Sequence, residues 1–227
     1  MINNFETLQE FLMQVPVFKE LSNQDIKELS QRSICKDYNK GKFIAHAGAI
    51  WPYVMVIADG EIRGVKISSE GRALNTLTIK KGEGFWNPSV FDDLPLLGSI
   101  EVWEPSRVYL WHKDVILPFL LPNSQAIWQI NIELVKQLRY KSELIGNFAF
   151  STISRRLARL LLDQFEGDNE PSITRNMSLE EIGTIIGTTP IMICKHISRF
   201  AESGLITVSR SEIKLSDKSA LEKIANI

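Results

Sequence analysis

The chain has 227 residues, of which 44% are hydrophobic and 23% charged, and its formal net charge is -1. At roughly 150 residues per domain, this length predicts one large domain or two small ones. The composition is typical of a globular protein and excludes a disordered, fibrous or membrane-spanning chain. Two cysteines, Cys35 and Cys194, are too few for a disulfide framework, an all-cysteine zinc site or a thiolate-held iron–sulfur cluster. We therefore expect no cofactor and, because no signal peptide or membrane span is visible, a cytoplasmic location.

The first half of the chain predicts short helices followed by strands. Apolar residues at three- and four-residue spacings between positions 8 and 32 indicate short helices, one of them starting at Ser22. From about Tyr38 to Trp111, short apolar runs separated by turn residues such as Asp59-Gly60 predict an antiparallel roll or barrel. The runs are Tyr53 to Ala58, Glu61 to Ile67, Ala73 to Ile79, Ile100 to Trp103 and Arg107 to Trp111.

After Pro122 the pattern becomes helical for about two dozen residues and has two apolar stripes. The first stripe is Ile127, Ile130, Leu134, Leu138 and Ile145, and the second is Trp128, Ile132 and Val135. Two stripes imply two neighbours, which we expect to be the roll and the same helix of a second subunit. The alternative is a helix buried wholly within its own monomer. Gly146 and Asn147 predict a hinge over residues 146–150 that interrupts the helix, and Thr152 is expected to cap the next one.

A capped pair of short helices near the C-terminus predicts DNA binding. Residues 178–181, Ser-Leu-Glu-Glu, have the pattern of a capping box, so the first helix starts near Ser178. Gly187 allows a sharp turn, after which Thr189 can cap a second helix that has Pro190 at its first position. The buried face of this second helix is expected at Ile193, Ile197 and Phe200.

A small hairpin is expected to follow the helix pair. Gly204 ends the second helix, and the runs 205–208 and 212–215 around Ser209-Arg210-Ser211 predict two short strands. Together they complete a winged helix-turn-helix, preceded by a helix over 153–165 and a polar loop over 166–176. The alternative is an ordinary three-helix bundle without DNA binding.

The order of these elements resembles the CRP/FNR family of transcription regulators, the group of the catabolite activator protein. The residues that carry the resemblance are Val15-Pro16-Val17-Phe18, Leu21-Ser22, Asp37-Tyr38, Lys40-Gly41, Asp59-Gly60-Glu61-Ile62, Gly82-Glu83-Gly84-Phe85, Gly146-Asn147-Phe148-Ala149-Phe150 and Gly204-Leu205-Ile206. The resemblance implies an α+β fold with an N-terminal antiparallel β-roll of the cyclic-nucleotide-binding type over 1–121. A long dimerisation helix over 122–146 and a C-terminal winged helix-turn-helix over 147–227 would follow.

The same resemblance implies a sequence-specific transcription regulator that acts as a homodimer. Its partners would be double-stranded DNA and RNA polymerase, with no membrane. No Ser-His-Asp or Cys-His arrangement and no phosphate-binding glycine loop is present, so an enzyme is not expected. His46, His112 and His196 have no cluster of Cys, Asp or Glu ligands around them, so neither haem nor another metal is expected.

The candidate effector pocket departs from the family pattern. In relatives that bind cyclic nucleotides, a Gly-Glu pair and an Arg-Ser or Arg-Thr pair hold the ribose and the phosphate, and the resemblance places Trp86-Asn87 and Leu96-Leu97 there. Without a guanidinium to pair a buried phosphate, cyclic AMP is not expected to bind in the usual mode. Lys141 and Ser142 fall where the family contacts the base, with Lys141 on the predicted dimer stripe. A small acidic or aromatic effector would then be bounded by Trp86, Leu96, Leu97 and Lys141. In the alternative, Trp86 and the two leucines fill the former pocket, Lys141 reaches water, and the regulator needs no effector.

The second helix of the pair also departs from the family, whose members commonly have an Arg-Glu pair at its start and an Arg four residues later. Here the matching residues are Pro190, Ile191 and Lys195. The candidate DNA contacts are Thr188, Thr189, Ile191, Met192, Lys195, Ser198, Arg199 and Arg210.

This departure leaves two interpretations open. Ile191 and Met192 could contact thymine methyl groups, so the target should differ from the family's usual palindrome. Residues 151–227 contain ten Lys or Arg and ten Asp or Glu, which provides no basic excess for phosphate binding. In the alternative, the exposed apolar residues bind protein, and the chain is a ligand-sensing or protein-interaction module that has lost operator binding.

Overall fold

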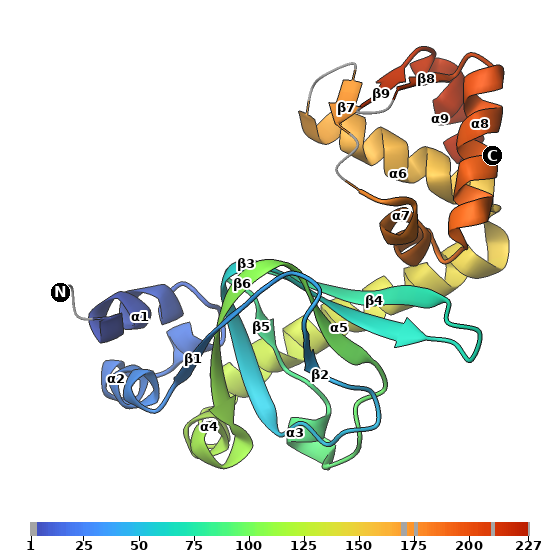
Figure 1. Cartoon of the computed structure of the whole chain (residues 1–227). Coiled ribbons are helices and arrows are strands. Elements are labelled where there is room, and N and C mark those ends of the chain that lie inside the picture. Colours follow the sequence, from blue (N-terminus) through green and yellow to red (C-terminus); the bar gives the residue numbers. More distant parts are fainter. Residues whose placement is uncertain (1–3, 169–171, 175–176, 210–211, 227) are drawn as a thin grey trace. The chain divides into compact units, whose positions relative to one another are not determined.

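The computed structural model describes residues 4–168, 172–174, 177–209 and 212–226. The chain divides into two compact units, one made of 1–66 with 76–141 and the other of 67–75 with 142–227. Helices combine with an antiparallel sheet in the first unit and with a small three-stranded sheet in the second (Figure 1). The predicted α+β class is confirmed. No helix in the described part of the chain is both long enough and apolar enough to span a bilayer.

The first unit opens with the short helices that the spacing predicts. They are α1 (Asn4–Leu12), the 3-10 helix η1 (Phe18–Glu20) and α2 (Asn23–Gln31). The hydroxyl of Ser22 accepts the amide hydrogen of Asp25 at 3.1 Å and so caps α2. Leu12, Ile26 and Leu29 turn inward and are almost fully buried.

The roll is one antiparallel sheet of six strands (Figure 1). Its main path is β1 (Ile34–Tyr38), β6 (Ser99–His112), β3 (Tyr53–Ile67) and β4 (Ala73–Lys80), while β2 (Phe43–Ala45) pairs with β6 and β5 (Gly84–Phe85) with β3. One core cluster gathers strand residues such as Met55 and Ile57. A second joins Val54, Val56 and Trp111 to α1, α2, α4 (Lys113–Leu120) and the start of α5 (Ser124–Phe150).

The turn predicted at Asp59-Gly60 and the break between residues 103 and 107 are wrong, because β3 and β6 each run through as one long strand. The pairing register shifts around Asp59 and Glu61. Gly60 has φ +87°, and a Cβ there would clash with Pro105 and Ser106 on β6. The glycine therefore forms a bulge in a paired strand, where sequence alone suggests a chain reversal.

The second unit contains the predicted helices and wing. After the last turns of α5 come α6 (Ile153–Asp168), β7 (Ser172–Thr174), α7 (Leu179–Ile186), α8 (Pro190–Glu202), β8 (Ile206–Val208), β9 (Glu212–Leu215) and α9 (Lys218–Asn226). The sheet order is β7-β9-β8. The prediction of a loop over 166–176 is wrong in part, because this segment includes the end of α6 and the strand β7. Arg210 and Ser211 of the wing turn lie outside the described residues, and α9 was not predicted.

The hinge predicted as a helix interruption over 146–150 is also wrong, because α5 continues through Gly146 and Asn147 to Phe150. A glycine costs a helix interior only about 1 kcal/mol, and Asn147 finds a partner outside its own backbone. Its side-chain oxygen accepts a hydrogen bond from Arg159 Nη1 at 2.9 Å. The helix ends at Phe150, and Thr152 caps α6 as predicted, accepting the amide hydrogen of Arg155 at 3.2 Å.

Candidate nucleic-acid interface

The first helix of the pair, α7, begins at the capping box that the sequence predicts. The Ser178 hydroxyl accepts the amide hydrogen of Glu181 at 3.1 Å, and the Glu181 carboxylate accepts that of Ser178 at 2.7 Å. Two amides that lack partners inside the helix are satisfied in this way. The start of α7 is therefore set by local hydrogen bonds.

The turn between α7 and α8 depends on two glycines. Gly187 ends α7 in the left-handed conformation, with φ 70° and ψ 48°. Gly183 lies one turn earlier, and a Cβ there would approach the carbonyl oxygen of Thr188 to 2.7 Å. The amide of Thr188 donates to the carbonyl oxygen of Gly183 at 2.9 Å. Gly187 is the turn glycine predicted from the sequence, whereas Gly183 was not predicted. The signal for Gly183 was a glycine in the middle of a helical pattern.

The second helix, α8, has one buried and one exposed face. The buried face consists of Ile193, His196, Ile197 and Phe200, which includes the three predicted residues. Ile191 is 79% exposed, and Lys195, Ser198 and Arg199 are exposed as well. Thr189 caps the helix by accepting the amide hydrogen of Met192 at 3.4 Å.

The structure thus brings most of the candidate DNA contacts together around α8. Ile191, Lys195 and Ser198 follow one another at four- and three-residue steps, which places them along one line of the helix surface. Thr188, Thr189 and Met192 are half-buried at its start. Arg210 lies outside the described residues.

Three arginines of α6 bind the ends of other helices, a role that the charge count did not reveal. Arg155 and Arg159 each donate through Nε to the carbonyl oxygen of Ala225 in the last turn of α9, at 3.1 and 2.9 Å. Arg156 donates through Nε to the carbonyl oxygen of Ile186 at 2.8 Å. Burial lowers the pKa of the Arg156 guanidinium. These three positive charges are engaged within the protein, so fewer of the ten basic residues are free for phosphate contacts.

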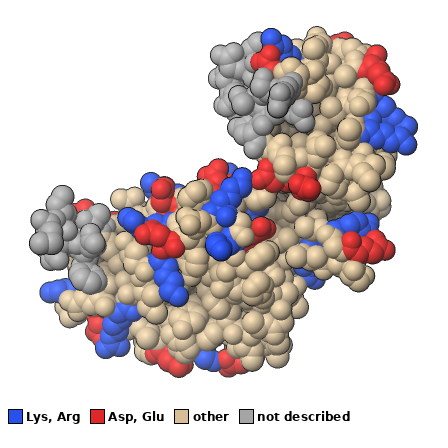
Figure 2. Space-filling view, viewed as in Figure 1, with Lys and Arg blue, Asp and Glu red and all other residues tan. Residues whose placement is uncertain are grey.

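Charge on the visible face of the roll is mixed. Figure 2 shows basic and acidic side chains interspersed over the visible face of the roll, with no large area of one sign. Such a surface supplies little sequence-independent attraction to DNA.

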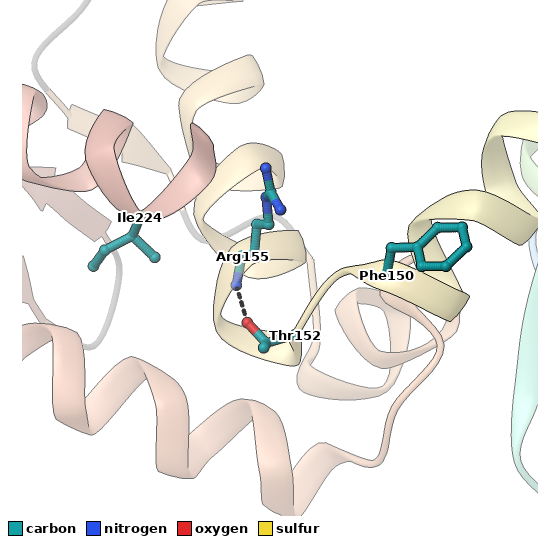
Figure 3. Close-up of a pocket in the computed structure, with 4 residues that line it drawn as sticks. All are labelled: Phe150, Thr152, Arg155 and Ile224. Atoms are coloured by element: carbon teal, nitrogen blue, oxygen red, sulfur yellow. Dashed lines mark hydrogen bonds between the residues drawn. The ribbon is translucent and has the colours of Figure 1, made fainter. Parts of the chain in front are cut away.

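A pocket of about 250 Å³ lies where α5, α6 and α9 meet in the second unit. It is lined by Phe150, Thr152, Arg155 and Ile224, and in Figure 3 Phe150 and Ile224 lie on either side of Thr152 and Arg155. Phe150 is 85% exposed. None of these four residues was predicted from the sequence to belong to a binding site.

His196 is the buried titratable group of α8. Its Nδ1 lies 3.2 Å from the hydroxyl oxygen of Ser154 on α6. Burial lowers the pKa of His196 below its ordinary value of 6.5, and the positive charges of Arg199 and Lys195 lower it further. The neutral imidazole is therefore the form that the folded unit favours.

We expect acid to destabilise the second unit through His196. Above pH 6.5 the imidazole is neutral in both folded and unfolded chains, and the free energy of unfolding is unaffected. As the pH falls below that value, the unfolded chain binds the proton first, so stability is lost until the pH passes the lowered pKa of the folded state. Urea unfolding between about pH 8 and pH 5 measures this. A His196→Gln variant should lose less stability over that range, and equal losses would show that other groups dominate.

The candidate effector residues on the roll are mostly built into its core. Trp86 is 1% exposed and packs against Phe18, with the ring centroids 6.2 Å apart. Asn87 is fully buried, and its Nδ2 donates to the carbonyl oxygens of Trp51 and Tyr53 at 3.1 and 2.6 Å. Both side chains therefore connect the segment after β5 to the rest of the roll.

The other candidates do not join them in one cluster. Leu96 is 6% exposed and belongs to the core cluster with Met55 and Ile57, whereas Trp86 belongs to the second cluster. Leu97 is 78% exposed. Lys141 and Ser142 are exposed on α5. In the described residues, no group of three or more His, Cys, Asp or Glu side chains could hold a metal ion.

The buried and exposed faces of α5 do not coincide with the two predicted apolar stripes. Ala126 and Ile130 are buried, and Ile127 and Leu134 pack against the same core cluster. A second set of residues recurs at alternating steps of three and four and is exposed along its whole length. We call this set the α5 seam: Trp128, Asn131, Val135, Leu138, Ser142, Ile145 and Ala149. This spacing is the one by which parallel helices pair, and it places Ser142, with Lys141 beside it, between Leu138 and Ile145.

Comparisons with known proteins agree with this geometry. Residues 155–224 match the family model of the Crp-like helix-turn-helix domain. The CRP-like cAMP-activated global transcriptional regulator of Mycobacterium tuberculosis is 22% identical over 224 residues, which cover 96% of this chain and 100% of that protein.

Two solved structures share the fold. A regulator of the CRP/FNR family from Eubacterium rectale has a TM-score of 0.80 at 17% identity and covers 94% of this chain and 99% of its own. The c-di-GMP responsive global regulator CLP of Xanthomonas campestris has a TM-score of 0.75 at 14% identity, covering 86% and 100%. The fold and the matched domain define a transcription regulator with a helix-turn-helix DNA-binding domain. Residues 155–224 belong to the Crp-like helix-turn-helix family, and the chain is similar over nearly its whole length to regulators of the CRP/FNR family.

Proposed function

We propose that the protein binds operator DNA as a homodimer, with α8 of each subunit in the major groove of one half-site. This proposal rests on the exposed line of Ile191, Lys195 and Ser198 on α8, a helix whose opposite face is buried in the core. Two such helices in a symmetric dimer would enter successive major grooves about 34 Å apart. RNA polymerase is the protein partner that the likeness to CRP-like transcription regulators suggests.

The chemistry of this face supports base reading. Lys195 can donate to the acceptor atoms of guanine or to a phosphate, and Ser198 can contact either kind of base pair. Ile191 offers an apolar surface suited to the methyl group of thymine. Because the candidate readers include Ile191 and Lys195 in place of the family's arginines and glutamate, the operator should differ from the usual family palindrome.

The α5 seam supports the homodimer. It combines Trp128, Val135, Leu138 and Ile145, which are 48 to 68% exposed on the single chain, in the heptad spacing of a parallel coiled coil. A second copy of α5 would cover these side chains. In this proposal, residues 1–121 are the effector domain, residues 122–146 join the subunits and residues 147–227 bind DNA.

We further propose that cyclic AMP is not the effector in the usual mode. By the family resemblance, Leu96 takes the position of the phosphate-binding arginine. Leu96 and the indole of Trp86 are both buried, and the Asn87 amide is bonded to backbone carbonyls. A phosphate placed there would lose its hydration without gaining a cation. The regulator is then effector-independent, or it responds to another small molecule. The c-di-GMP responsive regulator CLP, which shares this fold, responds to a molecule other than cyclic AMP.

The test is selection of duplex DNA from a random pool by the full-length protein, followed by affinity measurements. We expect a two-fold symmetric motif. A Lys195→Ala variant should bind it roughly 30-fold to 10⁴-fold more weakly, because each of the two half-sites loses a contact to a base edge that contributes about 1–3 kcal/mol. Addition of cyclic AMP should leave the dissociation constant unchanged.

Lys223→Ala is the matched control, because Lys223 is exposed in the same unit but lies on α9. It should leave the affinity nearly unchanged. Equal losses in the two variants, or no enriched motif, would argue against α8 as the reading helix. In that case the 79% exposure of Ile191 favours the alternative, a protein-interaction module, whose apolar contact should not weaken with salt as DNA binding does.

A further inference from the structure

Arg156 joins the ends of two helices that belong to different parts of the second unit. Its Nε donates to the carbonyl oxygen of Ile186, the last residue of α7, at 2.8 Å. Its Nη1 donates to the carbonyl oxygen of Ser151, directly after α5, at 2.6 Å. Carbonyl groups at helix C-termini lack partners within the helix and carry partial negative charge. A guanidinium, with several donors in one plane, can satisfy two such ends at once.

An aromatic ring from α5 completes the junction. The Arg156 guanidinium lies 4.9 Å from the ring centroid of Phe148. The same ring packs on the turn between α7 and α8, because a Cβ on Gly187 would approach its Cζ to 2.8 Å. Phe148 therefore contacts both the guanidinium and the turn that sets the direction of α8.

A second arginine reinforces the end of α5. Arg159 Nη1 donates to the side-chain oxygen of Asn147 at 2.9 Å, while its Nε donates to the carbonyl oxygen of Ala225 on α9 at 2.9 Å. The last turn of α5 is thus bonded to α6 through Asn147, and the residue directly after α5 is bonded to α6 through the carbonyl of Ser151. The two non-helical residues between α5 and α6 are both bonded, because the Ser151 carbonyl accepts from Arg156 and the Thr152 hydroxyl caps α6.

We propose that Arg156 is a positioning residue that fastens the helix-turn-helix to the last turns of α5, so that they move as one rigid body. We call Arg156, Phe148 and the carbonyls of Ser151 and Ile186 the arginine clamp. With the clamp closed, the chain cannot bend freely between α5 and α8. A change in the direction of α8 then requires a change in the direction of α5 itself. The link to operator recognition rests on the proposed function, whereas the clamp itself does not.

The direct test measures the distance between α5 and α8 by pulsed electron paramagnetic resonance. Spin labels are attached at Glu143→Cys and Ser198→Cys, two exposed positions, in the full chain with Cys35 and Cys194 replaced by serine. Labelled chains are diluted with unlabelled chains so that only distances within one chain are measured. We expect a narrow distribution in the parent and one about twice as wide in Arg156→Ala, because charge-assisted bonds to two helix ends are lost.

Arg155→Ala is the matched control, because Arg155 precedes Arg156 on α6 but its guanidinium donates to the carbonyl oxygen of Ala225 on α9 and not to α5 or α7. It should leave the distribution narrow. Phe148→Leu, which removes the ring but keeps an apolar side chain, should widen the distribution even if Arg156→Ala fails to fold. Unchanged width in Phe148→Leu, or equal widening in Arg155→Ala, would overturn the proposal.

A second readout links the clamp to DNA. On operators whose half-sites are moved apart by a single base pair, the parent protein should bind at least about tenfold more weakly, because two rigidly held helices cannot both fit. Arg156→Lys should lose this discrimination while binding an isolated half-site normally. Retained discrimination would count against the clamp. If the protein binds no DNA at all, the proposed function fails, and the distance measurement still decides on the clamp.

Discussion

Replacing Leu138 and Ile145 with glutamate is expected to leave the protein monomeric and to weaken operator binding by about 10²- to 10⁴-fold. The two side chains are 67% and 68% exposed on the single chain and are neighbours on the α5 seam. Pairing of two α5 helices would bury carboxylates beside carboxylates, which opposes association. Each subunit would then bind its half-site alone, without the gain in effective concentration that linked sites provide. Analytical ultracentrifugation and DNA titration measure the two effects.

Leu121→Glu serves as the control for added charge. Leu121 is 63% exposed, close to the 67% of Leu138, but it lies directly after α4 and is not part of the α5 seam. This variant should remain dimeric and bind DNA normally. A double variant that still dimerises would show that the α5 seam is not the interface. A monomeric variant with undiminished affinity would show that DNA binding does not need the dimer.

Replacing Gly187 with alanine is expected to destabilise the second unit by about 2–5 kcal/mol and to abolish specific DNA binding. The left-handed conformation of this residue, φ 70°, costs a residue with a Cβ about 1–2 kcal/mol. The new methyl group would also collide with the ring of Phe148, and relieving such overpacking costs about 1–3 kcal/mol. Calorimetry should show one transition shifted to lower temperature, with the unfolding of the roll little affected.

Gly204→Ala separates these two costs. Gly204 has φ 71°, but a Cβ there would have no atom within 4 Å. This variant should therefore lose only the backbone part, about 1–2 kcal/mol. The difference between the two alanine variants measures the contact of Phe148 with the turn. Equal destabilisation would contradict that contact and weaken the case for the arginine clamp.

Features whose causes lie within a few residues could be predicted from the sequence. Ser22 and Ser178 each cap a helix by bonding an amide three residues later, so the pattern and its cause are adjacent in the chain. The same holds for Thr189-Pro190 at the start of α8 and for Gly187, whose left-handed conformation follows from local sterics. The order of these local signals was sufficient to identify the roll, the long helix and the winged helix-turn-helix.

Features that depend on contacts between distant residues could be decided only by the tertiary structure. Gly60 forms a bulge because it is packed against Pro105 and Ser106, and residues 146–150 stay helical while arginines from α6 hold the end of α5. Local periodicity cannot distinguish a bulge from a turn, or a continuous helix from a hinge, because the residues that stabilise the bulge and the helix end lie elsewhere in the chain.

The same reason explains what was missed in the candidate sites. Helical spacing shows that α5 is apolar on more than one side, but only the packed roll determines that Leu134 is covered and that Leu138 and Ile145 are exposed. A count of charges treats Arg156 and Lys195 alike. The fold engages Arg156 at two helix ends and leaves Lys195 exposed on α8, because burial and partners, not residue type, determine what a charge can bind.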